Sequence, residues 1–360
     1  MPPATRIQHV ARTARYTSTA KAPPKAPIQP YRSASRSVRS TGAIEQQPAA
    51  KYAPPPVFSR SRALPWVLSS MIAGSIGFYM TRLFIEARRP CQNPGVGDIS
   101  QQKDVSGRYE DTADTFDSEV GLSEALMGVN RLRKKLARKC KGHVLEASCG
   151  TGRNLGYFDV GNGGEVESLT FVDLSPHMVE VCKKKWVALM GEKNEKLRPG
   201  LQVRFLTGSV IESMPSAPTK AKYDTIIQTM GLCSTPSPTD LLTNLVKHLD
   251  TTNPEARILL LEHGRSYRMW LNRILDNSAE KHAEIHGCWF NRDIGALVGE
   301  AAHKTGLDIV SERRHHFGTT WIFELKPSVE LASHKYPTAE LPLPPEQPQP
   351  SDWRSWVGLS

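Results

Sequence analysis

The feature that most constrains this chain is a glycine-containing stretch, HVLEASCGTGRN, at residues 143–154. Its apolar start predicts a short buried strand that ends near Glu146. Gly150 and Gly152 then allow a sharp turn and a close approach of the backbone to a ligand, because neither has a side chain. Asn154 is expected to open a helix whose free N–H groups face that ligand.

A second strand end completes a nucleoside-binding pattern. The segment LTFVDLS places Asp173 twenty-one residues after Gly152. A carboxylate at the tip of the second strand accepts hydrogen bonds from both hydroxyls of a ribose. The competing interpretation is a plain glycine-rich surface turn, and the position of Asp173 argues against it.

Two nucleoside classes fit such a unit. The dinucleotide fingerprint G-x-G-x-x-G fails at Leu155, although Gly156 gives a weaker variant. The S-adenosylmethionine fingerprint places an acid ahead of alternate glycines. The matching residues here are Glu146, Ser148, Gly150 and Gly152, with serine in place of the first glycine. The acid would repel a pyrophosphate but holds the ammonium of a methionyl group, so the pattern favours a methyltransferase over a nicotinamide-dependent oxidoreductase.

Four motifs resemble those of the class I methyltransferases: HVLEASCGTGRN, FVDLSPHMV, YDTIIQTMGLCS and LLLEHGRS. More narrowly, the chain resembles the fungal mitochondrial membrane-anchored methyltransferase-like family and its animal relatives among the methyltransferase-like membrane proteins. The resemblance covers about residues 105–326. The first two motifs are generic to the class, whereas GLCS and the pairing of EHG with a later HGC are more specific to the anchored group.

The resemblance implies S-adenosylmethionine as the cofactor and a set of residues that bind it. They are Glu146, Ser148, Gly150, Gly152, Asp173, Leu174, Met178, Ser209, Val210 and Thr229. Ser148 departs from the family pattern, and so does Ser209, which stands where members usually carry an acid for the adenine amino group. A hydroxyl accepts that hydrogen bond less strongly than a carboxylate. Tyr109 belongs to a stretch that resembles the helix over the cofactor and is a candidate lid residue.

Strand and helix patterns alternate through residues 105–326. Strands are expected at 143–147, 168–173, 201–206, 223–228, 256–262, 307–316 and 319–326. Helices are expected over RYEDTADTFDSEV and at 122–139, 176–190, 239–248 and 291–304. The helix at 122–139 is expected to bury one apolar face and to expose a solvated basic run. This alternation predicts an α/β, Rossmann-like class I methyltransferase fold with a seven-stranded, mostly parallel sheet and an antiparallel edge hairpin.

The basic leader is separate from this domain. Residues 1–62 hold eleven Lys or Arg and one acid, which accounts for the whole net charge of +10. A leader rich in Arg and Ser and poor in acids is typical of a mitochondrial transit peptide, and its prolines predict an extended, disordered chain. Because the excess charge lies there, the basic composition gives no evidence that the folded domain binds nucleic acid.

Residues 63–81 carry no charge, and the apolar run continues to residue 85. A membrane span needs about 17 to 25 residues, and Trp66 and Tyr79 fit the aromatic belt of the interfaces. We therefore expect a single transmembrane helix at 63–85, whose orientation stays open because arginines flank both ends. A linker at 86–104, the methyltransferase domain at 105–326 and a proline-rich disordered tail at 327–360 complete the predicted organisation.

Methyl transfer from a sulfonium depends mainly on alignment and needs a base only for a protonated acceptor. His263, after the fifth strand, is the predicted base, with His286 and Asn291 as the other candidates. A structural histidine bonded to backbone is the competing interpretation for His263. The six cysteines have no C-x-x-C spacing and the histidines form no zinc pattern, so no metal site is predicted. Cys149 and Cys233 are expected to be inert thiols near the pocket.

Two hypotheses on function follow. The first is a single-pass methyltransferase of the mitochondrial inner membrane, whose acceptor, by resemblance to the animal relatives, is small and lipophilic, such as a thiol or a quinone-like ring. Nucleic acid is not an expected partner, because the chain has no N-P-P-Y stretch. The second is a catalytically inactive member that assembles or stabilises inner-membrane complexes, which Ser148 and Ser209 keep open.

Overall fold

The computed structural model describes residues 63–191, 196–212 and 214–333. The predicted transit peptide and extended leader at 1–62 lie outside the described residues, and so does the proline-rich tail after residue 333. The tail is predicted from residue 327, but its first residues are ordered in β7 and in a short helix, α9 (Val329–Ser333).

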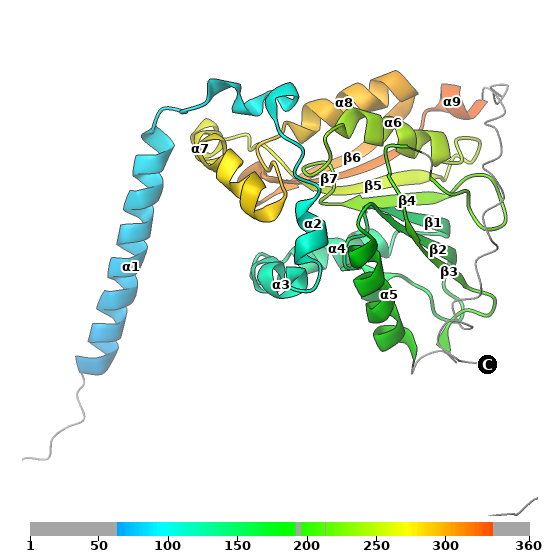
Figure 1. Cartoon of the computed structure of the whole chain (residues 1–360), viewed down its shortest axis with the longest axis horizontal. Coiled ribbons are helices and arrows are strands. Elements are labelled where there is room, and N and C mark those ends of the chain that lie inside the picture. The colour runs from blue at the N-terminus through cyan, green and yellow to red at the C-terminus, as the bar shows by residue number, and fades with distance from the viewer. Residues whose placement is uncertain (1–62, 192–195, 213, 334–360) are drawn as a thin grey trace, which may run out of the picture. The chain divides into compact units, whose positions relative to one another are not determined.

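Seven strands form one sheet in the order β3-β2-β1-β4-β5-β7-β6 (Figure 1). Their bounds are Gly142–Ala147 (β1), Val166–Asp173 (β2), Gln202–Thr207 (β3), Thr225–Thr229 (β4), Arg257–His263 (β5), Leu307–His315 (β6) and Thr320–Pro327 (β7). The first five are parallel, and β7 runs antiparallel to both β5 and β6. The predicted α/β fold with an antiparallel edge hairpin is confirmed.

Helices cover both faces of the sheet (Figure 1). Their bounds are Val129–Ala137 (α4), Pro176–Met190 (α5), Pro238–His248 (α6), Met269–His286 (α7) and Ile294–Thr305 (α8). One core joins the sheet to α6 and α8, and the other joins it to α4 and α5 around the fully buried Trp186. Because helices pack on both faces of the sheet, the central strands carry apolar side chains on both sides, as Val144 and Leu145 illustrate.

The chain reverses direction across the sheet between β1 and β4. From β1 it moves outward to β2 and β3, then returns to β4 on the other side of β1. Loops leave the carboxyl ends of β1 and β4 in opposite directions at such a point, and the crevice between them is where open α/β sheets bind ligands.

The helix predicted after Gly152 is wrong. The chain makes turns and only one 3-10 turn, η3 (Leu155–Tyr157), before β2. Gly156 and three glycines within residues 161–164 make this segment a poor helix former. The side chain of Asn154 also points inward, where it bonds Glu146, instead of capping a helix. The segment after Gly152 therefore supplies no helix N-terminus to the glycine turn.

Two helices are predicted before β1, but the structure has three in this segment. They are α2 (Arg108–Thr112), α3 (Phe116–Leu126) and α4, and Gly128 separates the last two with a φ of +73°. This break gives α3 and α4 different directions, so the predicted common apolar face does not form. Leu122 and Leu126 are exposed, whereas Leu136 is buried.

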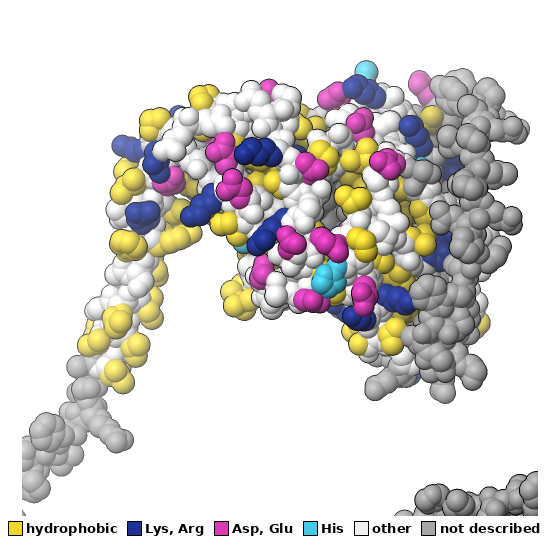
Figure 2. Space-filling view, viewed as in Figure 1, with side chains coloured by type: hydrophobic (Ala, Val, Ile, Leu, Met, Phe, Trp, Pro, Cys, Tyr) yellow, Lys and Arg dark blue, Asp and Glu magenta, His cyan; other side chains and the backbone are white. Residues whose placement is uncertain are grey.

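The apolar helix α1 spans Ala63–Arg88, three residues beyond its predicted end. Its segment Leu64–Arg88 is long and apolar enough to cross a membrane: an 18-residue window within it has a mean hydropathy of 1.3, and none of that window is buried. Figure 2 shows hydrophobic side chains on its surface. Because α1 continues to Arg88, the linker is shorter than predicted. It contains two 3-10 turns, η1 (Pro94–Gly97) and η2 (Ile99–Gln101).

Candidate functional site

The turn after β1 places three residues in left-handed backbone. Ser148 and Gly150 each have a φ of +53°, and Gly152 has a φ of +75°. A Cβ on Gly150 would meet open space, whereas one on Gly152 would lie 2.5 Å from a Leu155 methyl carbon. Gly150 therefore leaves the backbone accessible and Gly152 permits tight packing. Ser148 adopts a conformation that costs a non-glycine residue about 1–2 kcal/mol.

Asp173 ties this turn to the tip of β2. Its Oδ2 accepts a hydrogen bond from the Gly150 N–H at 2.8 Å, and its Oδ1 accepts one from the Ser175 N–H at 3.0 Å. Burial raises the pKa of the Asp173 carboxyl above its usual value. The neighbouring Leu174 is exposed, whereas Met178, in the first turn of α5, is buried. Ser175 is the N-cap of α5, and its side chain accepts a hydrogen bond from the Met178 N–H.

Glu146 lies beneath the same turn and is fully buried. Its Oε1 accepts a hydrogen bond from Asn154 Nδ2 at 2.8 Å, while its Oε2 has no partner in the described part of the chain. Burial raises the pKa of Glu146 to about 8. A buried carboxyl oxygen without a partner is costly unless a ligand satisfies it.

The ends of β3 and β4 complete the edge. Thr229 Oγ1 accepts hydrogen bonds from Asn154 Nδ2 at 3.1 Å and from Arg133 Nη1 at 2.8 Å. Ser209 Oγ accepts one from the Ile211 N–H at 3.3 Å, and the Val210 carbonyl is bonded by α6. All the predicted cofactor-binding residues thus lie at or just beyond the carboxyl ends of β1 to β4.

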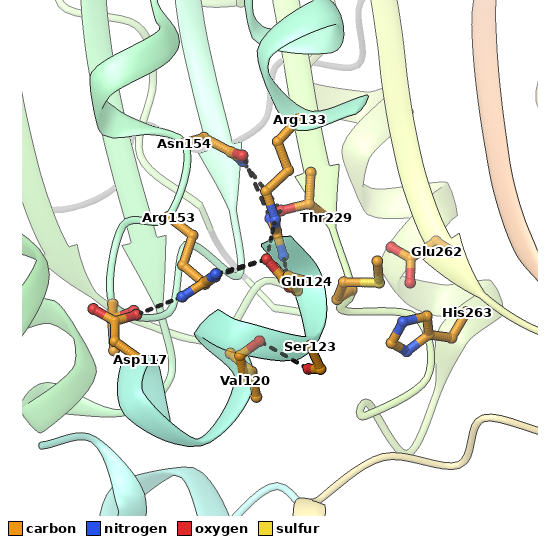
Figure 3. Close-up of polar contacts among 12 residues, drawn as sticks. Asp117, Val120, Ser123, Glu124, Arg133, Arg153, Asn154, Thr229, Glu262 and His263 are labelled. Carbon is orange, nitrogen blue, oxygen red and sulfur yellow. Dashed lines mark hydrogen bonds and ion pairs between the residues drawn. The ribbon is translucent and has the colours of Figure 1, made fainter. Parts of the chain in front are cut away.

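Two short helices, α2 and α3, lie over this edge, and we call them the cover helices. Asp117 Oδ1 accepts hydrogen bonds from Thr151 Oγ1 at 2.7 Å and from Arg153 Nη1 at 3.0 Å. Glu124 pairs with Arg153 and with Arg133, each at 2.8 Å (Figure 3). Helix α3 is therefore held to the glycine turn by ion pairs.

Sequence reasoning missed this ionic contact. Arg133 belongs to a basic run predicted to be solvated, yet it is 4% exposed. It lies between Glu124, Asn154 and Thr229. The alternation of apolar residues in α4 gives no sign of it, because an arginine on the buried side is not part of an apolar pattern.

Tyr109, the candidate lid residue, joins a cover helix to two loops. Its hydroxyl shares a hydrogen bond of 2.7 Å with Ser234 Oγ and donates to the Gly287 carbonyl at 3.1 Å. Burial raises the pKa of Tyr109 well above its usual value, so it is a neutral donor.

His263 is the last residue of β5 and is partly exposed. Its Nδ1 lies 3.9 Å from Cys288 Sγ, and Cys233 Sγ lies within 4.8 Å of both. A hydrogen bond from Cys288 and the His263 ring hold the pKa of Cys233 well below its usual value, although burial opposes this. These three residues are 25 or more positions apart in the sequence, so no spacing rule could group them.

The other two candidate bases lie elsewhere. Asn291 is fully buried and donates hydrogen bonds to the Val96 carbonyl and to Asp276, which gives it a structural role. His286 is exposed at the end of α7, where its ring lies against His282. Among these candidates, only His263 stands at the carboxyl end of a strand.

A doubly wound sheet with this strand order, a glycine turn after β1 and a carboxylate at the tip of β2 together define the class I methyltransferase fold. The family model described as a methyltransferase domain matches residues 123–312. The chain belongs to this family.

One curated relative is "Methyltransferase OMS1, mitochondrial" of Saccharomyces cerevisiae, which is 35% identical over 239 residues. The match covers 63% of this chain and 47% of the relative, so the chain spans about half the length of the relative that it matches.

Solved structures that resemble the chain include an O-methyltransferase from neocarzinostatin biosynthesis. It is 15% identical, with a TM-score of 0.41, and the match covers 61% of this chain and 59% of that one. The magnesium protoporphyrin IX methyltransferase of Synechocystis PCC 6803 is also 15% identical, with a TM-score of 0.38 and coverage of 72% and 100%.

Proposed function

We propose that the chain binds S-adenosylmethionine at the carboxyl edge of its sheet and transfers the methyl group to an acceptor. The observation that carries this proposal is the pair of carboxyl groups of Glu146 and Asp173 on neighbouring strands, on either side of the open backbone at Gly150. Family membership supports the same chemistry.

The residues of the edge fit the parts of this cofactor. Asp173 would accept hydrogen bonds from the ribose hydroxyls, and the exposed side chain of Leu174 would pack on the adenine. Ser209 and Val210 would flank that base. The unpartnered Oε2 of Glu146 would accept from the methionyl ammonium. The site would be shaped by Met178, Thr229 and the turn after β1, which contains Ser148 and the two glycines.

The cofactor, when bound, supplies a methyl group that is already activated, so the chain has to align the acceptor and exclude water. His263 is placed to remove a proton from an acceptor that must lose one, because its ring stands at the end of β5 and is partly exposed. The cover helices would shield the reacting groups from solvent.

The chain is further proposed to act at a membrane of mitochondria. The exposed apolar surface of α1 supports a single-pass anchor, and the yeast relative, a mitochondrial methyltransferase by name, supports the mitochondrion. We place the anchor in the inner membrane, and we infer a small lipophilic acceptor that reaches the site from the bilayer. No role of nucleic acid is proposed.

A second candidate function is that of an inactive methyltransferase-fold protein that assembles or stabilises inner-membrane complexes. It is favoured by Ser148, which occupies a left-handed position better suited to glycine. It is also favoured by the ion pairs that hold the cover helices down over the turn.

A transfer assay separates the two functions. The 360-residue chain in detergent micelles is incubated with methyl-tritiated S-adenosylmethionine and a lipid extract of mitochondrial membranes, and tritium in the organic phase is counted. We expect transfer by the wild type and by Gly156→Arg, which alters an exposed glycine beyond the turn. Gly150→Arg, which fills the open approach, should abolish it. Binding of the cofactor without any transfer would instead favour the assembly function.

A further inference from the structure

The cluster of Cys233, His263 and Cys288 has no part in holding the cofactor. Its members come from three elements: the loop after β4, the end of β5 and the loop between α7 and α8. Their ligand atoms all lie within 4.8 Å of one another, and Cys288 Sγ is 3.9 Å from His263 Nδ1. Two sulfurs and one imidazole nitrogen grouped this closely resemble three corners of a tetrahedral zinc site, whose bonds of about 2.0–2.3 Å would draw the ligands slightly closer together.

The three candidate ligands differ in how far they are buried. Cys233 and Cys288 are 1% and 6% exposed, whereas His263 is partly open to solvent. Three protein ligands with one open side are the arrangement of zinc sites that keep a fourth position for water. A fully enclosed structural site would need a fourth protein ligand.

A buried cation, Arg292, also stands near the two cysteines. Arg292 is 1% exposed and lies close enough to both cysteines to interact with them electrostatically. Its guanidinium donates to the neutral oxygens of Gln102, Leu232 and Thr235. Cysteine binds a metal as the thiolate, so a buried cation beside the two sulfurs favours a loaded site.

The loops that carry the ligands are anchored independently of any ion. Glu262 accepts hydrogen bonds from the Gly231 and Leu232 N–H groups, and the Trp289 N–H donates to the Cys233 carbonyl. The ligand set is thus held by backbone contacts on both sides, which is the preorganisation that a metal site requires.

From this geometry we infer that Cys233, His263 and Cys288 form a binding site for a thiophilic divalent ion of the zinc class. The ion would fix the loops after β4, β5 and α7 against one another beside the proposed acceptor end of the site. The inference leaves cofactor binding as proposed and replaces one part of the proposed function, because a loaded site makes His263 a ligand and removes it as a base.

Cobalt titration tests the site without reference to activity. The 360-residue chain in detergent is reduced with a phosphine, freed of metal with a chelator, and titrated with Co²⁺. We expect thiolate-to-cobalt charge-transfer absorption and the intense visible bands of tetrahedral Co²⁺, both abolished when Zn²⁺ is added. Cys288→Ser and His263→Gln should weaken binding at least about tenfold, whereas Cys91→Ser, which alters a thiol in the linker, should not.

X-ray absorption of the zinc-loaded wild type covers the case in which a variant fails to fold, and should report two sulfur neighbours and at least one nitrogen. A reduced wild type without charge-transfer absorption, or equal cobalt binding by Cys288→Ser, would overturn the inference. Calorimetry with S-adenosylmethionine on the same sample separates the two proposals. Cofactor binding without cobalt bands removes only the metal site, and cobalt bands without cofactor binding remove only the proposed function.

Discussion

Gly150 and Gly152 share one turn but meet different surroundings, so alanine at the two positions should have different costs. Gly152→Ala would press a Cβ to 2.5 Å from Leu155 and 2.7 Å from Cys182 in left-handed backbone. We expect it to lower the free energy of unfolding by about 2–4 kcal/mol. Gly150→Ala meets no atom, so it should cost only about 1–2 kcal/mol, the cost of the left-handed backbone itself. Urea unfolding of the two variants checks this, and equal losses would contradict it.

Glu146 predicts a pH dependence of stability. Its pKa is raised to about 8 in the folded chain, against about 4.3 in an unfolded one. Between these values the folded state holds a proton that the unfolded state has released, so the wild type loses stability as the pH rises, by at most about 1.4 kcal/mol per unit. The stability is fully present below about pH 4 and is lost by about pH 8.

Glu146→Gln keeps the Asn154 contact and cannot ionise. Its free energy of unfolding should therefore rise relative to that of the wild type between pH 5 and pH 8. Glu119→Gln, on the exposed side of α3, provides the matched control and should follow the wild type. Parallel curves for Glu146→Gln and the wild type would show that Glu146 is ionised in the folded chain.

The residues of the cofactor edge differ in how far sequence could identify them. Gly150, Gly152 and Asp173 follow from spacing alone, because a turn and a strand tip are local features. Arg133 and Cys288 do not, since their roles depend on partners that the fold brings from distant segments. Local pattern predicts the position of a residue within its own element, and the tertiary contacts of its side chain require the structure.

The same limit holds for whole elements. Strands and long amphipathic helices were predictable within about two residues, as the match of α5 at 176–190 illustrates. The helix expected after Gly152 does not form, because the glycines of this segment disfavour a helix. The helix expected over 122–139 is interrupted at Gly128. The resemblance of the motifs indicated a glycine turn and a helix over the cofactor. It did not indicate which helices and turns form these two parts of the site.

The cover helices should loosen when their ion pairs are removed. Glu124 joins Arg133 and Arg153, and its side chain is only 14% exposed. Glu124→Gln removes its charge, and we expect the closed position to lose about 1–3 kcal/mol. Hydrogen–deuterium exchange over α3, residues 116–126, should then become faster than in the wild type.

Glu119→Gln alters a neighbouring acid of α3 that bonds Thr115 on its own helix, and it should leave exchange unchanged. High salt should have little effect on the Glu124 pairs, because buried pairs are screened weakly. Unchanged exchange in Glu124→Gln would mean that apolar packing, and not these pairs, holds the cover helices.

For the molecule as a whole, α1 determines whether the site works at a membrane. Its exposed apolar residues include Ile72 and Ile76. Arginine at each of the two positions would cost about 2.5–3.5 kcal/mol within a bilayer, so the double variant should no longer float with liposomes while the wild type does. Val310→Arg changes an exposed apolar residue of β6 and should float normally. Flotation of the double variant would contradict a membrane span.

The central claim is that the carboxyl edge of this sheet binds S-adenosylmethionine, and calorimetry tests it most directly. The 360-residue chain in detergent is titrated with S-adenosylmethionine, S-adenosylhomocysteine and NADPH. Asp173→Ala removes the predicted ribose ligand, and Asp308→Ala removes an exposed acid of β6 as the matched control. We predict binding of both sulfur nucleosides by the wild type and by Asp308→Ala, its loss in Asp173→Ala, and no binding of NADPH. A folded chain that binds neither sulfur nucleoside, or that binds them equally well without Asp173, would contradict the account.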